Sequence, residues 1–308
     1  LKDIEDLLKR LEVEGSVLQG QEILDIHQLM VLGKGLRRFF LKSEVKAPSL
    51  QEKISKLSSL KALEKEILHA INTKGEILDR ASPGLSDIRH RLGAVREKAK
   101  GVLEHLLHRE DLQPIFQEDF ITLRNGRYVL LIKSDFKHRL EGIIHDQSHS
   151  RMSLFFEPLQ VVPFNNEINI LTSEEKEEEY RILADLSERM RGEVQSLRSD
   201  FEIFGELDLL YAMARLTLLL KGIRPELNGD GKIMMREARS PLLSLQKEAQ
   251  VIPVDLRMGE SIRTLIISGA NAGGKTVALK TLGLLTLMIQ SGLPIPVAEG
   301  SELAIFDE

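Results

Sequence analysis

A glycine-rich stretch near the end of the chain constrains its fold more than any other feature. Residues 269–276 read GANAGGKT and fit the pattern G-x-x-x-x-G-K-[ST] without a mismatch. The apolar run RTLIISG, residues 263–269, predicts a strand before the glycines, and residues 275–290 predict a helix after them. A strand, a glycine loop and a helix in this order predict an α/β unit in a chain that otherwise reads as mostly helical.

The glycine pattern predicts a nucleotide site, because glycines let successive backbone N–H groups point at one phosphate cluster. Lys275 can reach the β and γ phosphates, and the Thr276 hydroxyl can bind Mg²⁺, the metal expected here. A glycine turn that only joins a strand to a helix would not account for the Lys-Thr pair. The candidate residues for binding ATP or ADP are Gly269, Ala270, Asn271, Ala272, Gly273, Gly274, Lys275 and Thr276.

Composition narrows the class of protein. The chain has 308 residues, 42% of them hydrophobic, which is enough for two or more domains. The lack of cysteine excludes disulfides, thiolate metal sites and cysteine nucleophiles. No signal peptide or membrane-spanning run is recognisable, which predicts a soluble cytoplasmic protein without a membrane partner. With a net charge of −5, any contact with nucleic acid has to come from local patches.

Helical periodicity covers residues 1 to about 112 and a second block of about 173–220. Ser82-Pro83 predicts the start of one helix, because proline is tolerated in a first turn. Ser173 is expected to cap a long helix in the second block, and the glutamates of SEEKEEEY to form a solvated face. The apolar positions expected to pack are Leu85, Ile88, Leu92, Val95, Ala99, Val102 and Leu106, and then Leu183, Leu186, Met190, Val194, Leu197, Phe201 and Phe204.

Between the two blocks the periodicity changes to that of strands. Asn125-Gly126, between ITLR and RYVLLI, predicts a β-hairpin in a small antiparallel module. Residues 124–151 hold six Lys or Arg and three acids, so their local charge of +3 fits either an anion-facing tip or an ordinary solvated hairpin. Further on, Gly229 and Gly231 predict a turn and KIMMREA a strand. The final ELAIFDE resembles a Walker B strand ending in Asp307-Glu308, but an ordinary sheet strand is the preferred interpretation.

Residues 264–308 resemble the MutS family of ABC-type ATPases, and within it the second bacterial subfamily, MutS-two. The segments DFITLRNGRYVLLIK, GIIHDQSHSRMSLFFEPLQVVPFNNEI and GEILDRAS resemble the same subfamily, so the similarity covers essentially the whole chain. The family loop reads G-P-N-[TM]-G-G-K-[TS], and this chain departs from it at Ala270 and Ala272. In ARSPLL, Ser240 stands where the family has histidine.

The resemblance implies a multidomain α plus α/β fold. A long-helix core and lever would occupy residues 1–118 and 165–222, a β-rich clamp-like insertion residues 119–164, and the first part of a P-loop ATPase domain residues 223–308. It also implies that the true Walker B strand, the signature loop and a Smr nuclease domain follow Glu308. Without the first two, the isolated chain is expected to bind nucleotide weakly and to hydrolyse it hardly at all.

The resemblance further implies a homodimeric ATPase that clamps branched DNA and suppresses homologous recombination, or one that acts through rRNA on stalled or collided ribosomes. A hypothesis of another class is a binding and dimerisation scaffold whose phosphate loop stays empty. Mismatch reading is not favoured, because the Phe-x-Glu letters at Phe116 and Phe155 fall in or beside the lever and clamp. The residues His138, His145, Asp146 and His149 are interpreted as surface hairpin residues, with metal binding as the alternative.

Overall fold

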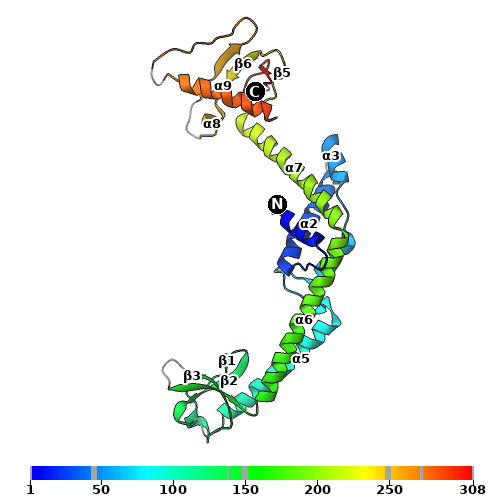
Figure 1. Ribbon diagram of the computed structural model, residues 1–308, viewed down its shortest axis with the longest axis vertical. Helices are drawn as coiled ribbons and strands as arrows, with labels where there is room; N and C mark the ends of the chain where they lie inside the picture. Colours follow the sequence, from blue (N-terminus) through cyan, green and yellow to red (C-terminus); the bar gives the residue numbers. More distant parts are fainter. Residues whose placement is uncertain are drawn as a thin grey trace. The chain divides into compact units, whose positions relative to one another are not determined.

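The computed structural model describes residues 2–42, 47–136, 139–147, 152–246, 251–270 and 273–306. The chain forms two compact units, Leu1–Phe201 and Glu202–Glu308, and each is considered by itself (Figure 1). The first unit combines helices with a small antiparallel sheet, and the second combines helices with a mixed sheet. The mixture of helices and two small sheets confirms the expected α plus α/β composition. None of the helices in these described ranges is both long and apolar enough to cross a membrane.

The first unit is mainly helical. Its helices are α1 (Glu5–Glu12), α2 (Gly20–Lys42), α3 (Pro48–Ser55), α4 (Lys61–Ala70), α5 (Pro83–Leu107), α6 (Val162–Gly192) and the first part of α7 (Val194–Leu220). Short 3-10 turns lie at η1 (Asp79–Ala81), η2 (Gln113–Ile115) and η3 (Ser134–Phe136). The expected helix start at Ser82-Pro83 is confirmed, because Pro83 occupies the first turn of α5 and the Ser82 hydroxyl accepts a hydrogen bond from the Leu85 N–H at 2.9 Å.

Helix α6 begins eleven residues before the predicted cap, so the prediction for Ser173 is wrong. Its N-cap is Val161, and a proline lies in the first turn, where a missing N–H costs nothing. Ile168 and Leu171 are buried in this first part, 4% and 0% exposed, so tertiary packing holds a stretch rich in asparagine and β-branched residues in helical form. Ser173 therefore lies inside the helix.

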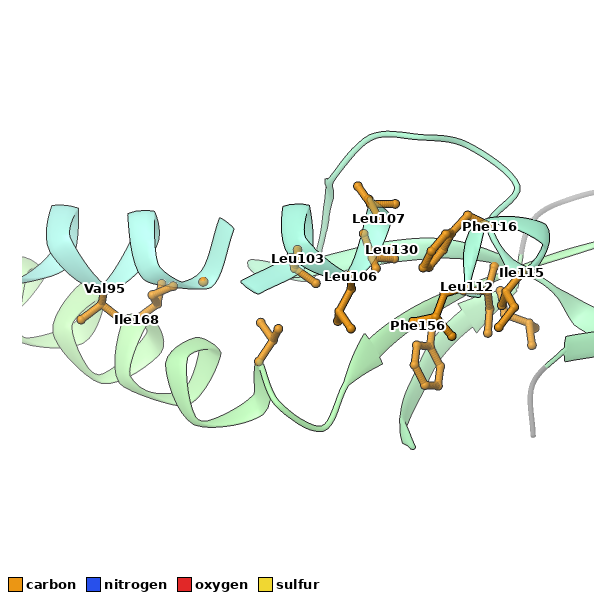
Figure 2. Packing of buried hydrophobic residues seen from close by; sticks show 14 of the residues in the cluster. Val95, Leu103, Leu106, Leu107, Leu112, Ile115, Phe116, Leu130, Phe156 and Ile168 are labelled. Carbon is orange, nitrogen blue, oxygen red and sulfur yellow. The ribbon is translucent and has the colours of Figure 1, made fainter. Parts of the chain in front are cut away.

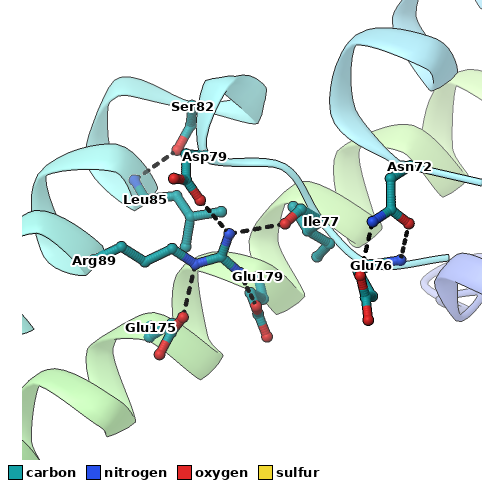
Figure 3. Close-up of polar contacts among 9 residues, drawn as sticks. All are labelled: Asn72, Glu76, Ile77, Asp79, Ser82, Leu85, Arg89, Glu175 and Glu179. Atoms are coloured by element: carbon teal, nitrogen blue, oxygen red, sulfur yellow. Dashed lines mark hydrogen bonds and ion pairs between the residues drawn. The ribbon is translucent and has the colours of Figure 1, made fainter. Parts of the chain in front are cut away.

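The sequence predicts that the glutamates after Ser173 form a solvated face, but two of them, Glu175 and Glu179, contact Arg89 of α5. Arg89 of α5 lies between two of them, with Glu175 Oε1 2.7 Å from its Nε and Glu179 Oε1 2.6 Å from Nη2 (Figure 3). The same guanidinium donates to the carbonyl of Ile77 at 2.8 Å and to Asp79 at 2.5 Å. Arg89 thus ties α5 to α6 and to η1, and these contacts raise its pKa further above the usual value even though partial burial opposes them.

The long second block consists of two helices, because α6 ends at Gly192 and α7 starts at Val194. Glu193 between them has φ −107° and ψ 10°, outside the helical region. The apolar spacing was nevertheless informative. Most of the positions that it marked on both sides of the break are buried, namely Leu183, Leu186, Met190, Val194, Leu197 and Phe204.

The predicted β-hairpin is confirmed within a four-stranded antiparallel sheet, here called the β-module. Its strands are β1 (Thr122–Arg124), β2 (Arg127–Lys133), β3 (Gly142–Gln147) and β4 (Ser153–Pro158), in the order β1-β2-β4-β3. Asn125 and Gly126 both have positive φ, 52° and 75°, as a two-residue hairpin turn requires. Arg124 pairs with Arg127 across this turn.

One hydrophobic core joins the β-module to the helices that lead into and out of it (Figure 2). Leu103 and Leu106 near the end of α5 share this core with Leu130 of β2 and Phe156 of β4, all 2% exposed or less. Farther along the same core, Val95 of α5 meets Ile168 of α6 (Figure 2). Since α5 enters the module and α6 leaves it side by side, the two helices form an antiparallel pair with the β-module at one end.

In its described residues, the second unit contains a mixed sheet and two helices besides the end of α7. Its elements are β5 (Glu226–Asn228), β6 (Ile233–Ala238), α8 (Pro241–Ser244), β7 (Val254–Met258), α9 (Lys275–Gln290) and β8 (Glu302–Ala304). The strand order is β5-β8-β6-β7, with β5 and β8 parallel and the other pairs antiparallel. The predicted strand KIMMREA and the predicted helix at 275–290 are confirmed as β6 and α9.

Replacing Arg89 by alanine should lower the free energy of unfolding of the first unit by about 1.5–3 kcal/mol, because three carboxylates lose a charge-assisted hydrogen bond. The matched control is Arg91→Ala on the same helix, which among the described residues forms one ion pair, an exposed 3.6 Å contact with Asp87. That change should cost less than about 0.5 kcal/mol. Urea unfolding followed by circular dichroism measures both, and equal effects would contradict the tie assigned to Arg89.

Candidate functional site

The segment before the glycine loop is not the strand that its composition predicted. Residues 263–268 have no strand partner in the described part of the chain and no regular secondary structure. Ile266 is 84% exposed, and Ile267 and Leu265 are 38% and 39% exposed. The physical reason is that an apolar run adopts strand geometry only when a neighbouring strand takes up its N–H and C=O groups, and none of the described strands lies beside it.

The loop itself has the backbone geometry that its glycines permit. Gly269 has φ +149° and Gly274 has φ +82°, both values that a residue with a Cβ rarely adopts. The Gly273 N–H donates to the carbonyl of Ala270 at 3.1 Å, which closes a tight turn before the helix. Asn271 and Ala272, two of the eight predicted binding residues, lie outside the described residues.

Lys275, the first residue of α9, folds back over this turn. Its Nζ donates to the carbonyl oxygens of Gly269 at 2.5 Å and Ala270 at 2.7 Å. The Lys275 ammonium group thus joins the start of α9 to Gly269, six residues earlier in the chain. The loop is solvent-exposed on both sides of this contact, so the lysine can exchange the two carbonyls for an anion without opening a buried core.

The start of α9 is suited to a negatively charged ligand. Its N-cap is Gly274, which has no side chain to accept from the first N–H groups of the helix. In the described part of the chain no side chain caps these donors, so they and the positive end of the helix dipole can meet a phosphate group. Thr276 is exposed in the first turn, where its hydroxyl can serve as a ligand to Mg²⁺.

The far end of α9 anchors the loop to the second unit. Leu285, Met288 and Ile289 of this helix are buried in a core with Ile233 and Met235 of β6. By contrast Val277 and Leu279, one turn from the loop, are 42% and 63% exposed. The helix is thus held at its C-terminal half, while its N-terminal half carries the loop into solvent.

The segment that resembled a Walker B strand forms a strand of the mixed sheet. Residues Glu302–Ala304 form β8, which lies between β5 and β6, with Leu303 and Ala304 fully buried. The two acids that would hold a metal-bound water, Asp307 and Glu308, lie outside the described residues. The residues that fit Mg²⁺ in the described loop are therefore limited to Thr276.

A second polar site lies within the β-module, around Glu157 of β4. This carboxylate is fully buried and pairs with the Arg127 guanidinium through two contacts of 2.8 Å. Its oxygens also contact the Asn165 amide at 2.7 Å and His145 Nε2 at 2.5 Å. Burial by itself raises the pKa of Glu157, but the hydrogen bonds from Arg127, Asn165 and His145 outweigh it, and the pKa lies below its ordinary value.

The network around Glu157 includes one of the three clustered histidines of the sequence, His145. His145 is engaged by Glu157, whereas His138 and His149 lie outside the described residues. Within the described ranges, no group of three or more His, Asp or Glu side chains could hold a metal ion. His145 is therefore a partner of a buried carboxylate at the junction of the β-module and α6.

Part of the local positive charge of residues 124–151 is already neutralised. Arg124 pairs with Asp146 and lies over the Phe155 ring at 4.9 Å, and Arg127 pairs with Glu157. Lys133 donates to the carbonyl of Pro114. Lys137 and Arg151 lie outside the described residues.

The two Phe-x-Glu sequences are not exposed wedges. Phe116 is 4% exposed within the core of the first unit, Phe156 is 1% exposed, and Glu157 is fully buried. Phe155, the first letter of the second match, lies under Arg124. These positions support the interpretation of both matches as chance.

The sequence analysis does not predict two sets of polar contacts, those of Asn165 with Tyr128 and those of Arg89 with the glutamates of α6. Asn165 is fully buried and holds Tyr128 by its backbone N–H and C=O, both at 3.0 Å. Glu175 and Glu179 are four apart and therefore on one face of a helix, which was the available signal for a shared partner. Nothing in the sequence placed Arg89, 86 residues upstream of Glu175, at that face.

Curated proteins similar in sequence to this chain carry the same name, Endonuclease MutS2. The chain is 42% identical over 305 residues to Endonuclease MutS2 of Pelotomaculum thermopropionicum, covering 99% of this chain and 38% of that protein. It is 38% identical over 309 residues to Endonuclease MutS2 of Caldanaerobacter subterraneus, covering 100% and 38%. It is 39% identical over 310 residues to Endonuclease MutS2 of Listeria innocua, covering 100% and 39%. No protein-family model matches the chain.

The glycine loop at the start of α9, the β-module between paired helices and these matches over nearly the whole of this chain agree with one another. The chain belongs to the MutS family and, within it, to the MutS2 group. It spans a little over a third of the length of the relatives that it matches, 38% of the first two.

Replacing Glu157 by glutamine should lower the free energy of unfolding of the first unit by about 3 kcal/mol at pH 7, because a buried ion pair loses one partner. The native pKa of this carboxyl is depressed, so the stability that it adds is present above the unfolded-state pKa of about 4.3. It is lost as the pH falls through the lower native pKa. The difference between wild type and variant should therefore stay level from pH 7 to about pH 5 and shrink below about pH 4.3.

Urea unfolding at a series of pH values measures this difference. Glu141→Gln is the control, since Glu141 is exposed and should change stability by less than about 0.5 kcal/mol at each pH. A Glu157→Gln difference that does not change with pH would contradict the role given to this carboxylate.

Proposed function

We propose that this chain is the lever, clamp and nucleotide-binding part of a MutS2-type ATPase, and that residues 269–276 bind ATP or ADP with Mg²⁺. The observation that carries the proposal is the position of Lys275. Its ammonium group lies over the glycine turn at the uncapped start of α9, where it meets the carbonyls of Gly269 and Ala270. A phosphate group at the helix start would replace these two carbonyls as the partner of the lysine.

We assign the parts of the chain as the family resemblance implies. Residues 1–118 and 165–222 form the core and lever, 119–164 the clamp-like insertion and 223–308 the first part of the ATPase domain. Support comes from the antiparallel pair α5 and α6, which carries the β-module at one end. Support for the last assignment comes from the core that anchors α9 against β6 and β8.

In the nucleotide complex each loop residue has a separate task. Gly269 and Gly274 provide the positive φ angles that aim the backbone N–H groups inward. Lys275 would neutralise charge on the outer phosphates, and the Thr276 hydroxyl would help to hold Mg²⁺. Bound Mg²⁺ supplies Lewis-acid stabilisation of the phosphoryl group. We expect weak binding and little hydrolysis by residues 1–308 alone, because the described residues contain no group of three or more His, Asp or Glu side chains that could hold a metal ion.

We further propose that the parent protein works as a cytoplasmic homodimer that clamps branched DNA and suppresses homologous recombination, with ATP acting on the clamp through the levers. The nuclease activity in the relatives' name belongs to those proteins. For this chain, nucleic acid is the partner that the MutS relationship favours. A helix pair that links a sheet module to one end of a long helix suits the transmission of a nucleotide signal.

Calorimetric titration of the 308-residue chain with ADP and with ATP–Mg²⁺ tests the nucleotide site. Lys275→Ala should weaken binding by about 10- to 100-fold, since a hydrogen bond to a charged group contributes about 1.5–3 kcal/mol. Lys280→Ala is the matched control, because Lys280 is exposed farther along α9, outside the glycine loop. It should leave binding unchanged.

Equal loss in both variants would mean that general charge, and not the loop, attracts the nucleotide. No binding by the unsubstituted chain would favour the scaffold hypothesis, in which the loop stays empty in residues 1–308 and the lever and β-module are the working parts.

A further inference from the structure

A groove in the first unit, remote in sequence from the glycine loop and from the β-module, is lined mainly by cations. It has a volume of about 440 Å³ and lies between the second half of α2, the start of α4 and the start of α7. We call it the α2–α4 groove. Its charged lining residues are Lys34, Arg37, Arg38, Lys42, Lys61, Glu64 and Asp200.

The two acids of the groove are already used by the protein. Glu64 holds Lys34 at 2.9 Å. Asp200 is only 3% exposed and accepts a hydrogen bond from the Ser58 N–H at 2.8 Å. Both carboxylates therefore already have partners within the protein, and five cations against two carboxylates leave a charge of +3 in the groove.

The cations fall into two groups. Arg37 is structural, since its guanidinium donates to the carbonyls of Leu57 and Ser58 and so fixes the connection between α3 and α4. Three others are exposed, and in the ranges that the structure describes they form no ion pair: Arg38, Lys42 and Lys61.

These three cations are placed to act together. Arg38 and Lys42 are four residues apart, so they extend from one face of α2. Lys61 approaches the groove from the first residue of α4, where the positive end of the helix dipole adds to the potential. Three unpaired cations gathered around one concave surface would repel one another, and a polyanion lying in the groove relieves that repulsion.

We propose that the α2–α4 groove binds the phosphodiester backbone of nucleic acid. The chain as a whole carries −5, whereas the charged residues that line the groove sum to +3. Contacts of this type hold a strand in register without reading its bases. The groove would give the first unit a nucleic-acid contact that needs neither nucleotide nor the β-module.

The test is the salt dependence of binding. The 308-residue chain is titrated against a fluorescein-labelled duplex of DNA, and separately of RNA, with anisotropy read at several salt concentrations between 50 and 200 mM. The triple variant Arg38→Gln, Lys42→Gln, Lys61→Gln should bind more weakly. Its slope of log affinity against log salt should be smaller by about three, about one for each lost phosphate contact.

The matched control removes the same charge elsewhere on the first unit. Arg96→Gln, Lys98→Gln, Lys176→Gln changes three exposed cations of α5 and α6 that lie outside the groove. It should keep the wild-type slope. The same loss in both triple variants, or no measurable binding by the unsubstituted chain at 50 mM salt, would overturn the proposal. A stronger effect with DNA or with RNA identifies which backbone the groove prefers.

This outcome is separable from that of the nucleotide site. The groove variant should bind ADP as the wild type does, and Lys275→Ala should keep the full salt slope for nucleic acid. Thermal unfolding of both triple variants should match wild type within about 2 °C, because all six positions are exposed.

Discussion

The antiparallel packing of α5 against α6 is the constraint on which the first unit depends. The described residues of the β-module form four short strands, and a small sheet needs packing against other elements to be stable. Its strands bury Leu130 and Phe156 against Leu103 and Leu106 of α5, so the module and the helix pair share one core. At the other end of the pair, Arg89 and the glutamates of α6 set the register with charge-assisted hydrogen bonds. Apolar contacts and polar contacts therefore fix opposite ends of one helical stalk.

The buried carboxylate of Glu157 continues this arrangement into the β-module. Arg127 of β2, His145 of β3 and Asn165 of α6 all contact it, so one side chain joins three elements of the structure. Burying a charged carboxylate costs free energy unless its oxygens accept hydrogen bonds. Here Arg127, His145 and Asn165 supply those contacts. The buried carboxylate of Glu157 thus fixes the position of the start of α6 against strands β2 and β3.

In the second unit, the glycine loop has to be anchored to the core and still be accessible to a ligand from solvent. The C-terminal half of α9 is buried against β6, while the loop at its N-terminus and the segment before it are exposed. Anchoring through the helix places Lys275 and the free N–H groups of α9 on a fixed support. The loop can then change its partners, carbonyl for phosphate, without disturbing the core of the unit.

The sequence by itself determined the elements that local chemistry specifies. The cap at Ser82 with Pro83, the turn at Asn125-Gly126 and the helix after the glycine loop each depend on residues within a few positions of one another. The family could be recognised for the same reason, since its glycine pattern is contiguous. Contacts between distant residues were decided only by the tertiary structure. The start of α6, the partners of its glutamates and the burial of Glu157 all depend on which elements come together in space. Residues 263–268 show the limit most plainly, because an apolar run becomes a strand only when another strand lies beside it, and no local sequence can supply that neighbour.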